Sequence, residues 1–355
     1  MTRSWTARLH ETPRTRFEAS TFAPKPAEER GLARDEVRLL VGTPDGIDHV
    51  RFRDLPDHLH PGDVLVVNTS ATVNGQVDAV LDGDPVVLHV AHRLDDGDRV
   101  VELRTAPDAG RAILDAWEGA VVAVGDVRLV LREPWPSGTP SSPTGRGNRL
   151  WRASVRGDLD RQLDWNGRPI AYGYLDHRYP LSAYQTVFGF RPGSAEMASA
   201  GRPFTDALVT RLVAAGVHFA PVTLHTGVSS QEAGEAPGPE WFEVPPTSAR
   251  LINGSRADGG RVVAVGTTAT RAVESSVRGR HVIAGRGWTD RVVTPGDPPR
   301  VVDGLVTGWH DPMASHLLLV EAVAGPGLTQ AAYDAAVAEG YLWHEFGDSA
   351  LLLRR

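Results

Sequence analysis

Residues 260–271 read GRVVAVGTTATR, and this stretch sets the fold prediction for the chain. Its apolar run predicts a buried strand, and the residues that follow it, Gly266, Thr267 and Thr268, predict the start of a helix. Free N–H groups at such a helix start bind carboxylate or phosphate, and Arg271 can add a bidentate contact one turn later. The alternative interpretation is an ordinary capped helix in which Arg271 pairs with Glu274 on the surface.

The same alternation of strands and helices extends to both sides of this stretch. An apolar run, VLVVN at 64–68, follows a Pro-Gly-Asp turn and predicts another buried strand. Further patterns predict helices at 205–215, 248–257, 267–277, 315–324 and 329–339, and strands at 218–224, 261–265, 301–307 and 350–353. Alternating elements of this kind are typical of an α/β domain.

Between about residues 76 and 164 the pattern changes. Short β-branched runs such as VVAV at 121–124 recur there, and Asp-Gly and Gly-Asp turns separate them. Hairpins of this kind predict a small all-β module. We therefore predict an α/β main domain formed by residues 1–75 and 165–355, with an all-β domain inserted at 76–164.

The composition excludes several classes of protein. The 355 residues are 41% hydrophobic and contain no cysteine, so we expect a globular core without disulfides, thiolate metal sites or cysteine nucleophiles. No run of about 18 apolar residues occurs, so we expect no membrane helix and a cytoplasmic location. The net charge of −7 argues against a nucleic-acid partner, because phosphate binding normally needs a basic surface.

Three histidines are candidates for chemistry. His225 ends a predicted strand, His310 directly precedes a predicted helix, and His316 lies inside that helix. A histidine can exchange protons near neutral pH, although an isolated histidine is more often structural or exposed. The chain has no zinc-type histidine spacing, GxSxG elbow, GxGxxG loop or Walker loop, and we expect no metal.

Further motifs follow one another along nearly the whole chain. They are, in order, GDVLVVN (62–68), YQTVF (184–188), AG (200–201) with FT (204–205), VTLH (222–225), GRVVAVGTT (260–268), VDGLVT (302–307) and FGD (346–348). In this order they resemble the S-adenosylmethionine:tRNA ribosyltransferase-isomerase family of the queuosine pathway. The resemblance implies a barrel-like α/β main domain with a small β-barrel inserted in it.

The resemblance also implies an activity. Members of this family transfer the ribosyl group of S-adenosylmethionine to an aminomethyl-deazaguanine base in tRNA, and adenine and methionine leave. The sulfonium acidifies the neighbouring ribose carbon, so a positioned base can remove its proton. The resemblance implies no metal or redox cofactor, because S-adenosylmethionine is itself the substrate.

The matching motifs imply which residues bind the substrate and react with it. The substrate-binding residues on this resemblance are Asn68, Tyr184, Gln185, Ala200, Gly201, Phe204, Thr223, Gly266, Thr267, Thr268 and Arg271. For the general base we rank His225 first, with Glu321 as its competitor and His310 as a further catalytic candidate. Glu321 lies in a largely apolar predicted helix, and burial raises the pKa of a carboxyl group. The alternative is that Glu321 pairs with an arginine and His225 bonds a backbone carbonyl.

The chain departs from the family pattern where positive charge and a proton carrier are expected. Two family arginines are Ala71 and Gln76 here, and a family histidine is Pro203, which cannot carry a proton. In a late predicted helix, a leucine and a serine of the family become His316 and Glu321. We predict that the S-adenosylmethionine half of the pocket is kept and that the acceptor half is altered.

Three functions are open at this point. The first is an enzyme that consumes S-adenosylmethionine with an altered acceptor other than tRNA, by ribosyl transfer to a small molecule or by cleavage or rearrangement of S-adenosylmethionine. The second is a genuine tRNA ribosyltransferase-isomerase, against which the acidic charge and the missing arginines count. The third is a non-catalytic S-adenosylmethionine-binding protein. The sequence leaves the oligomeric state open.

Overall fold

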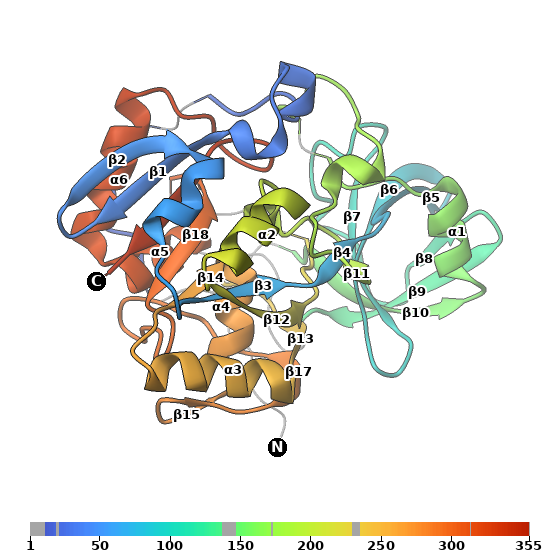
Figure 1. The fold of residues 1–355 in the computed structure, drawn as a ribbon. Coiled ribbons are helices and arrows are strands. Elements are labelled where there is room, and N and C mark those ends of the chain that lie inside the picture. Colours follow the sequence, from blue (N-terminus) through green and yellow to red (C-terminus); the bar gives the residue numbers. More distant parts are fainter. Residues whose placement is uncertain are drawn as a thin grey trace.

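The computed structural model describes residues 11–18, 21–136, 147–171, 173–228, 235–312 and 314–354. Within these ranges two bodies lie side by side, a larger α/β domain and a smaller β-barrel (Figure 1). The α/β domain is built from both ends of the chain, and the barrel comes from the segment between them.

A mixed sheet of nine strands forms the centre of the main domain. Its spatial order is β17 (Gly285–Thr289), β13 (Glu240–Val244), β12 (His218–Leu224), β3 (Val64–Asn68), β14 (Val262–Val265), β18 (Gly304–Gly308), β19 (Ser349–Leu353), β1 (Arg38–Thr43) and β2 (Gly46–Arg51). The central strands β3 and β14 are buried along their whole length. Continuous apolar runs suit this position, because other elements cover both faces of the sheet.

Four neighbouring strands in the middle of this sheet run parallel. β3 pairs in parallel with β12 and β14, and β14 pairs in parallel with β18. Their carboxyl ends therefore meet at one edge, where His225 follows β12, Gly266 follows β14 and Trp309 follows β18. In open α/β sheets this is the edge at which ligands bind.

Helices cover both faces of the sheet. One apolar core joins it to four helices, α3 (Pro246–Ala257), α4 (Gly266–Glu274), α5 (Ser315–Ala324) and α6 (Pro326–Ala338). On the other face a second core contains Leu208 and Leu212 of α2 (Asp206–Ala214) and Phe52 of a 3-10 helix. A short hairpin of β15 (Val277–Arg278) and β16 (His281–Val282) follows α4.

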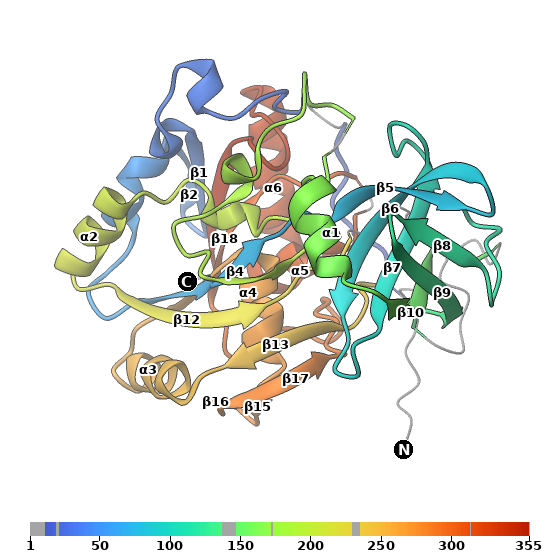
Figure 2. The same cartoon turned by 90° about the vertical axis from the view of Figure 1, so that its right-hand side faces the viewer.

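A closed barrel forms the second domain and stands apart from α2 and α3 (Figure 2). The strand order around it is β10 (Leu150–Arg156), β7 (Arg99–Thr105), β6 (Asp84–Arg93), β5 (Gln76–Leu81), β8 (Val121–Val124) and β9 (Val127–Pro134). Successive side chains alternate between the faces of a strand, so Leu88 and Leu103 belong to the barrel core. Helix α1 (Leu159–Asn166) adds Leu159 and Leu163 to the same core.

The barrel is inserted between two short strands that pair with each other. β4 (Ser70–Thr72) precedes it in the chain, β11 (Arg191–Ser194) follows it, and the two pair in parallel. All six barrel strands lie within the predicted segment 76–164, whereas α1 crosses the end of that segment. We keep 76–164 as the proposed limits of the inserted domain.

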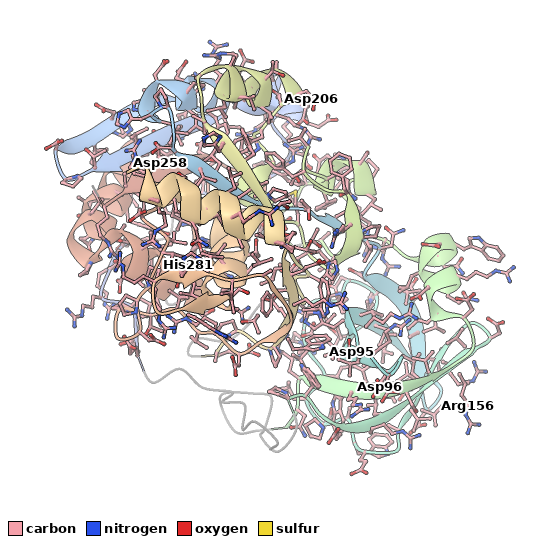
Figure 3. The ribbon with its side chains drawn as sticks, turned by 60° about the horizontal axis from the view of Figure 1, so that its bottom comes forward. Asp95, Asp96, Arg156, Asp206, Asp258 and His281 are labelled. Carbon is pink, nitrogen blue, oxygen red and sulfur yellow. The ribbon has the colours of Figure 1, made fainter. Side chains whose placement is uncertain are left out.

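The turn between β6 and β7 brings the barrel against the main domain. Its Asp95 lies on the side of the barrel towards the main domain, whereas Arg156 lies at the far end (Figure 3). Trp288 of β17 donates from Nε1 to Asp95 at 3.3 Å, and the ring of Trp288 meets His92 edge to face. The two domains therefore share a contact that is part polar and part aromatic.

The predicted fold class, an α/β domain with an inserted β-barrel, is confirmed. Among the described strands, the barrel closes and the main sheet runs from β17 to β2.

The strand predicted at 301–307 begins only at Gly304, because the backbone N–H groups of Arg300, Val301 and Val302 donate to the Glu274 carboxylate at 2.8, 2.9 and 3.1 Å. Glu274 is thus buried, and the alternative of a surface pair with Arg271 is wrong.

Candidate active site

A cavity of about 130 Å³, which we call cavity A, lies at the carboxyl ends of β12, β14 and β18. The chain brings residues from distant positions to its wall. Six of the predicted site residues line it: Ala200, Gly266, Thr267, Thr268, Arg271 and His310. The central prediction from the sequence, a pocket at the end of the GRVVAVGTT stretch, therefore coincides with a real hollow.

The first turn of α4 forms one part of this wall. Gly266 has a φ of +91°, and a Cβ there would lie 3.3 Å from that of Ala200, so both conformation and space favour glycine. The side-chain amide of Asn68 donates to Thr268 Oγ1 at 3.2 Å and to the Leu224 carbonyl at 2.9 Å. Asn68 thus fixes the helix start against the ends of β3 and β12, and the free N–H groups of this turn can bind an anion.

Arg271 lies on the wall, but much of its hydrogen-bonding capacity is used inside the protein. Its guanidinium forms an ion pair with Glu240 and donates to the carbonyls of Arg291 and Gly238 at 3.1 and 2.9 Å. Three of its five N–H donors are therefore engaged by the described residues. Arg271 holds the segment that begins β13, and its two other donors meet no acceptor among the described residues.

Three histidines stand together on the wall of cavity A. His310 and His316 stack with ring centroids 5.0 Å apart, and His344 meets His310 edge to face at 6.3 Å. Burial lowers the pKa of His316 and of His344 to about 4 and lowers that of His310 well below its usual range. The rings are therefore neutral at neutral pH, and a neutral imidazole can accept a proton. His310 Nε2 lies 3.0 Å from Thr307 Oγ1.

Besides Glu240, which pairs with Arg271, two further carboxyl groups line cavity A, Glu196 from the loop after β11 and Glu345 from the segment before β19. The side chain of Glu345 is buried, with 7% of the residue exposed. Burial, reinforced by the charge of Glu196 and opposed by Arg202, raises the pKa of Glu345 well above its usual range. Among the described residues, no donor reaches Glu345 Oε2.

A larger cavity of about 580 Å³, cavity B, lies between the barrel and the main domain. His225 lines it, with Nδ1 2.7 Å from Ser70 Oγ and the ring stacked on Trp241. Burial, with the charge of Arg191 adding to it, lowers the pKa of His225 to about 4. Gly193 lies so close that a Cβ there would meet the imidazole at 2.6 Å. His225 therefore faces a different cavity from Gly266, although the next residues in the chain line cavity A.

Six predicted substrate-binding residues line neither cavity: Asn68, Tyr184, Gln185, Gly201, Phe204 and Thr223. Phe204 packs edge to face on Phe52 in the core, and Thr223 Oγ1 bonds Thr69 Oγ1 at 2.9 Å. The side chain of Gln185 bonds the backbone N–H and carbonyl of Thr72 at 3.2 and 2.8 Å. These side chains hold the segments that surround the cavities.

Glu321, the predicted competitor for the base, is placed away from both cavities. It is buried in α5, and its Oε1 accepts hydrogen bonds from the backbone N–H of Arg14, the backbone N–H of Thr15 and the hydroxyl of Thr15, at 2.7, 2.6 and 2.7 Å. The carboxylate thus anchors the segment near the N-terminus on α5. The geometry gives Glu321 a structural role in place of the expected catalytic one.

The departures from the family pattern occupy three different places. Pro203 lines a hollow of about 20 Å³ that it shares with His344 and Glu345, next to cavity A. Gln76 exchanges two backbone hydrogen bonds with Arg168, at 2.9 and 2.8 Å, so an arginine lies beside this position. Ala71 is buried in β4.

Sequence reasoning missed several residues of cavity A, above all Glu196, Glu240, His344 and Glu345. One signal was available, because His344 and Glu345 directly precede the FGD motif at 346–348.

Over the described ranges, no group of three or more His, Cys, Asp or Glu residues is arranged to hold a metal ion. No helix in the described part of the chain is long and apolar enough to cross a membrane.

Comparisons with known proteins agree over nearly the whole chain. A family model described as "Queuosine biosynthesis protein" matches residues 16–352. S-adenosylmethionine:tRNA ribosyltransferase-isomerases from Symbiobacterium thermophilum and Deinococcus radiodurans are 35% and 38% identical, covering 94% and 90% of this chain and 96% and 90% of their own. The crystal structure of an S-adenosylmethionine tRNA ribosyltransferase from Thermotoga maritima is 28% identical with a TM-score of 0.51, over 94% of this chain and 96% of that one.

Proposed function

The chain belongs to the queuosine biosynthesis protein family, the family of the S-adenosylmethionine:tRNA ribosyltransferase-isomerases, and on this premise we propose that it is a cytoplasmic enzyme that transfers the ribosyl group of S-adenosylmethionine to an acceptor. One observation carries the proposal. Cavity A combines an anion-binding helix start, neutral histidines and a buried acid at the carboxyl edge of the parallel strands. S-adenosylmethionine offers a carboxylate, an acidified ribose carbon and a leaving heterocycle to these three features.

We assign substrate binding and proton transfer to different residues of cavity A. The first turn of α4, at Gly266–Thr268, binds the substrate carboxylate, and Arg271 contributes its two remaining donors. His310 accepts the proton from the ribose carbon next to the sulfonium, because it lines cavity A and is neutral. The sequence ranks His225 first for this step, but its position on cavity B favours a role on the acceptor side instead.

For the acceptor, we keep the proposal of a small molecule other than the family's tRNA base. Two arginines and a histidine of the family pattern are Ala71, Gln76 and Pro203 here, and the chain carries a net charge of −7. Cavity B is large enough for a small acceptor, and His225 with Trp241 offers it an imidazole and an aromatic face. A neutral His225 can take a proton from the attacking amine of the acceptor.

A tRNA acceptor is the second candidate. The names of the relatives favour it, since those proteins are called tRNA ribosyltransferase-isomerases and resemble this chain from end to end. The position of Arg168 beside Gln76 also returns one positive charge near a lost family arginine. A specific tRNA complex would weaken steeply with rising salt, because each phosphate contact releases counterions.

The test is incubation of the purified protein with S-adenosylmethionine in three arms. The first arm holds S-adenosylmethionine alone, the second adds tRNA that carries the aminomethyl-deazaguanine base, and the third adds the free base as a small acceptor. Mass spectrometry follows adenine, methionine and methylthioadenosine. Adenine and methionine released only with tRNA support the second candidate, and release without tRNA supports an altered acceptor. Binding of S-adenosylmethionine without turnover in any arm would overturn both and leave a non-catalytic binder.

A further inference from the structure

Among the described residues, two buried glutamates have an Oε2 without a donor, Glu321 and Glu345, and of these Glu345 lies on cavity A. It lines cavity A, 7% of the residue is exposed, and no donor among the described residues reaches its Oε2. Buried polar atoms in native proteins are normally hydrogen-bonded, so an exception points to a role outside the fold itself. The roles assigned above to the helix start, His310 and His225 leave this carboxyl group unused.

The surroundings of Glu345 keep it in the acid form. The charge of Glu196 acts on it, and Glu345 in turn helps to raise the pKa values of Tyr174 and Tyr184. The charge of Arg202 opposes the effect of Glu196, but Arg202 already donates two hydrogen bonds to Glu28, at 3.2 and 2.9 Å. The adjacent His344 uses Nδ1 to accept the backbone N–H of Glu345 at 2.8 Å and is itself neutral. Burial and these neighbours together raise the pKa of Glu345 well above its usual range.

A carboxylic acid in its neutral form offers one O–H donor and one carbonyl acceptor side by side. One edge of adenine presents the complementary pair, the N7 acceptor and the N6 amino donor. Glu345 therefore matches the heterocycle that leaves in the proposed reaction. It also shares a hollow with Pro203, the position at which the chain has lost a histidine of the family pattern.

We propose that Glu345 binds the adenine of S-adenosylmethionine through its N7 and N6 edge and acts as the general acid for its departure. This proposal rests on the proposed function. The acceptor amine forms a bond to ribose C1′ and gives its proton to His225, and the bond between C1′ and adenine N9 breaks. The electron pair of the broken bond passes into the purine ring, and N7 takes the proton of the Glu345 carboxyl. Adenine then leaves as a neutral molecule, and Glu345, left as a carboxylate, regains a proton from water before the next cycle.

The test compares Glu345→Gln with Glu345→Ala. Glutamine keeps a donor and an acceptor in the geometry of the neutral acid but has no proton to give, whereas alanine removes both. We expect Glu345→Gln to bind adenine and S-adenosylmethionine within about threefold of the original protein, since it keeps the hydrogen-bonding pattern. Its rate of adenine release should fall about 10²–10⁴-fold. Glu345→Ala should lose about tenfold in binding as well, as one hydrogen-bonded pair disappears.

The measurements are calorimetric titration with adenine and with S-adenosylmethionine, and chromatographic assay of adenine release across pH. The rate of the original protein should fall as the pH rises through the pKa of Glu345, and that of Glu345→Gln should show no such fall. Glu339→Gln, which removes an exposed carboxylate at the end of α6, is the matched control and should keep the original rate.

Two failures can be told apart. Equal adenine release by the original protein and Glu345→Gln overturns the role of Glu345 and leaves the proposed function intact. If the original protein neither binds S-adenosylmethionine nor releases adenine, the proposed function fails and this inference fails with it.

Discussion

Two buried glutamates in this molecule have opposite surroundings. In the barrel, Glu102 accepts hydrogen bonds from Arg104 and Arg149, at 2.9 and 3.1 Å, and its other oxygen lies 3.2 Å from His89 Nδ1. Burial opposes its ionisation, but the hydrogen bond from His89 and the two arginine charges outweigh it and lower the pKa of Glu102 to about 2. On cavity A, the pKa of Glu345 moves the other way, and its Oε2 has no donor among the described residues.

This difference in hydrogen bonding distinguishes Glu102, a structural carboxylate, from Glu345, a carboxyl group that is available to a ligand. Strand alternation turns His89, Glu102 and Arg104 away from the apolar interior of the barrel, and Arg149 joins them to Glu235 of the main domain at 2.6 Å. Such a network holds two domains together and leaves nothing for a ligand. A buried carboxyl group that stays unsatisfied is costly for the fold, and proteins accept such costs at functional sites.

The largest expected effect comes from breaking the satisfied network. Arg149→Met removes the cation that Glu102 and Glu235 share, and both carboxylates stay buried. Removing one partner of a buried ion pair costs about 3–5 kcal/mol, because the remaining charge loses its compensation. Urea denaturation should therefore show a loss of this size in the free energy of unfolding. Arg132→Met, an exposed change on the same barrel, is the control, and equal stabilities of the two variants would contradict the comparison.

The next effect concerns the histidines of cavity A, which are partly buried and neutral. Burial, with His344 and Arg271 adding to it, lowers the pKa of His316 from 6.5 to about 4. The folded state then binds fewer protons than the unfolded state, so stability is full above pH 6.5 and is lost as the pH falls towards 4. In His316→Leu, the free energy of unfolding should fall by about 2–3 kcal/mol less on acidification than in the original protein. The measurement is the melting temperature against pH, which should give a flatter profile for this variant.

The exposed His218, at the start of β12 and outside cavity A, provides the control for this measurement. His218→Leu removes an imidazole without touching the cavity, so the pH profile of the melting temperature should match that of the original protein. Matching profiles for the two leucine variants would show that cavity A does not desolvate its histidines.

A smaller effect of opposite sign is expected at Glu345. Because its pKa is raised above 4.5, its contribution to stability is present below pH 4.5 and is lost as the pH rises towards the folded pKa. Glu345→Gln should therefore be more stable than the original protein, by on the order of 1 kcal/mol at neutral pH. Thermal unfolding between pH 4.5 and 8 should show the gap widening with pH. A gap that narrows instead would mean that Glu345 is ionised and paired, as Glu102 is.

The sequence predicts one side of cavity A well and the other side poorly. The strand, glycine and helix start at 262–268 form a local pattern, and local patterns are visible in a sequence. Arg271 lines cavity A, and its role as a substrate-binding residue stays a prediction. Its partner Glu240 comes from a distant strand, and no spacing along the chain indicates that pair. Glu345 lies in an irregular segment, and only the fold brings it to the same cavity as Glu196, so the effect of Glu196 on the pKa of Glu345 could not be anticipated from the sequence.

The smallest expected effect concerns a third buried glutamate, Glu321, whose hydrogen bonding is intermediate between that of Glu102 and that of Glu345. Glu321 Oε1 is satisfied by three donors near the N-terminus, and no donor in the described part of the chain reaches its Oε2. Glu321→Gln keeps a carbonyl acceptor for the donors of Arg14 and Thr15 and loses only the charge, so we expect a loss of about 0.5–1 kcal/mol in the free energy of unfolding. Thr15→Val, which removes one donor and keeps the carboxylate, should cost a similar amount. Turnover of S-adenosylmethionine should stay within about twofold in both variants, because this cluster lies outside cavities A and B. A rate loss of about 100-fold or more in Glu321→Gln alone would restore Glu321 as the base. It would also mean that a hydrogen-bonded carboxyl group in this fold can be catalytic, so the number of hydrogen bonds does not distinguish structural from functional glutamates.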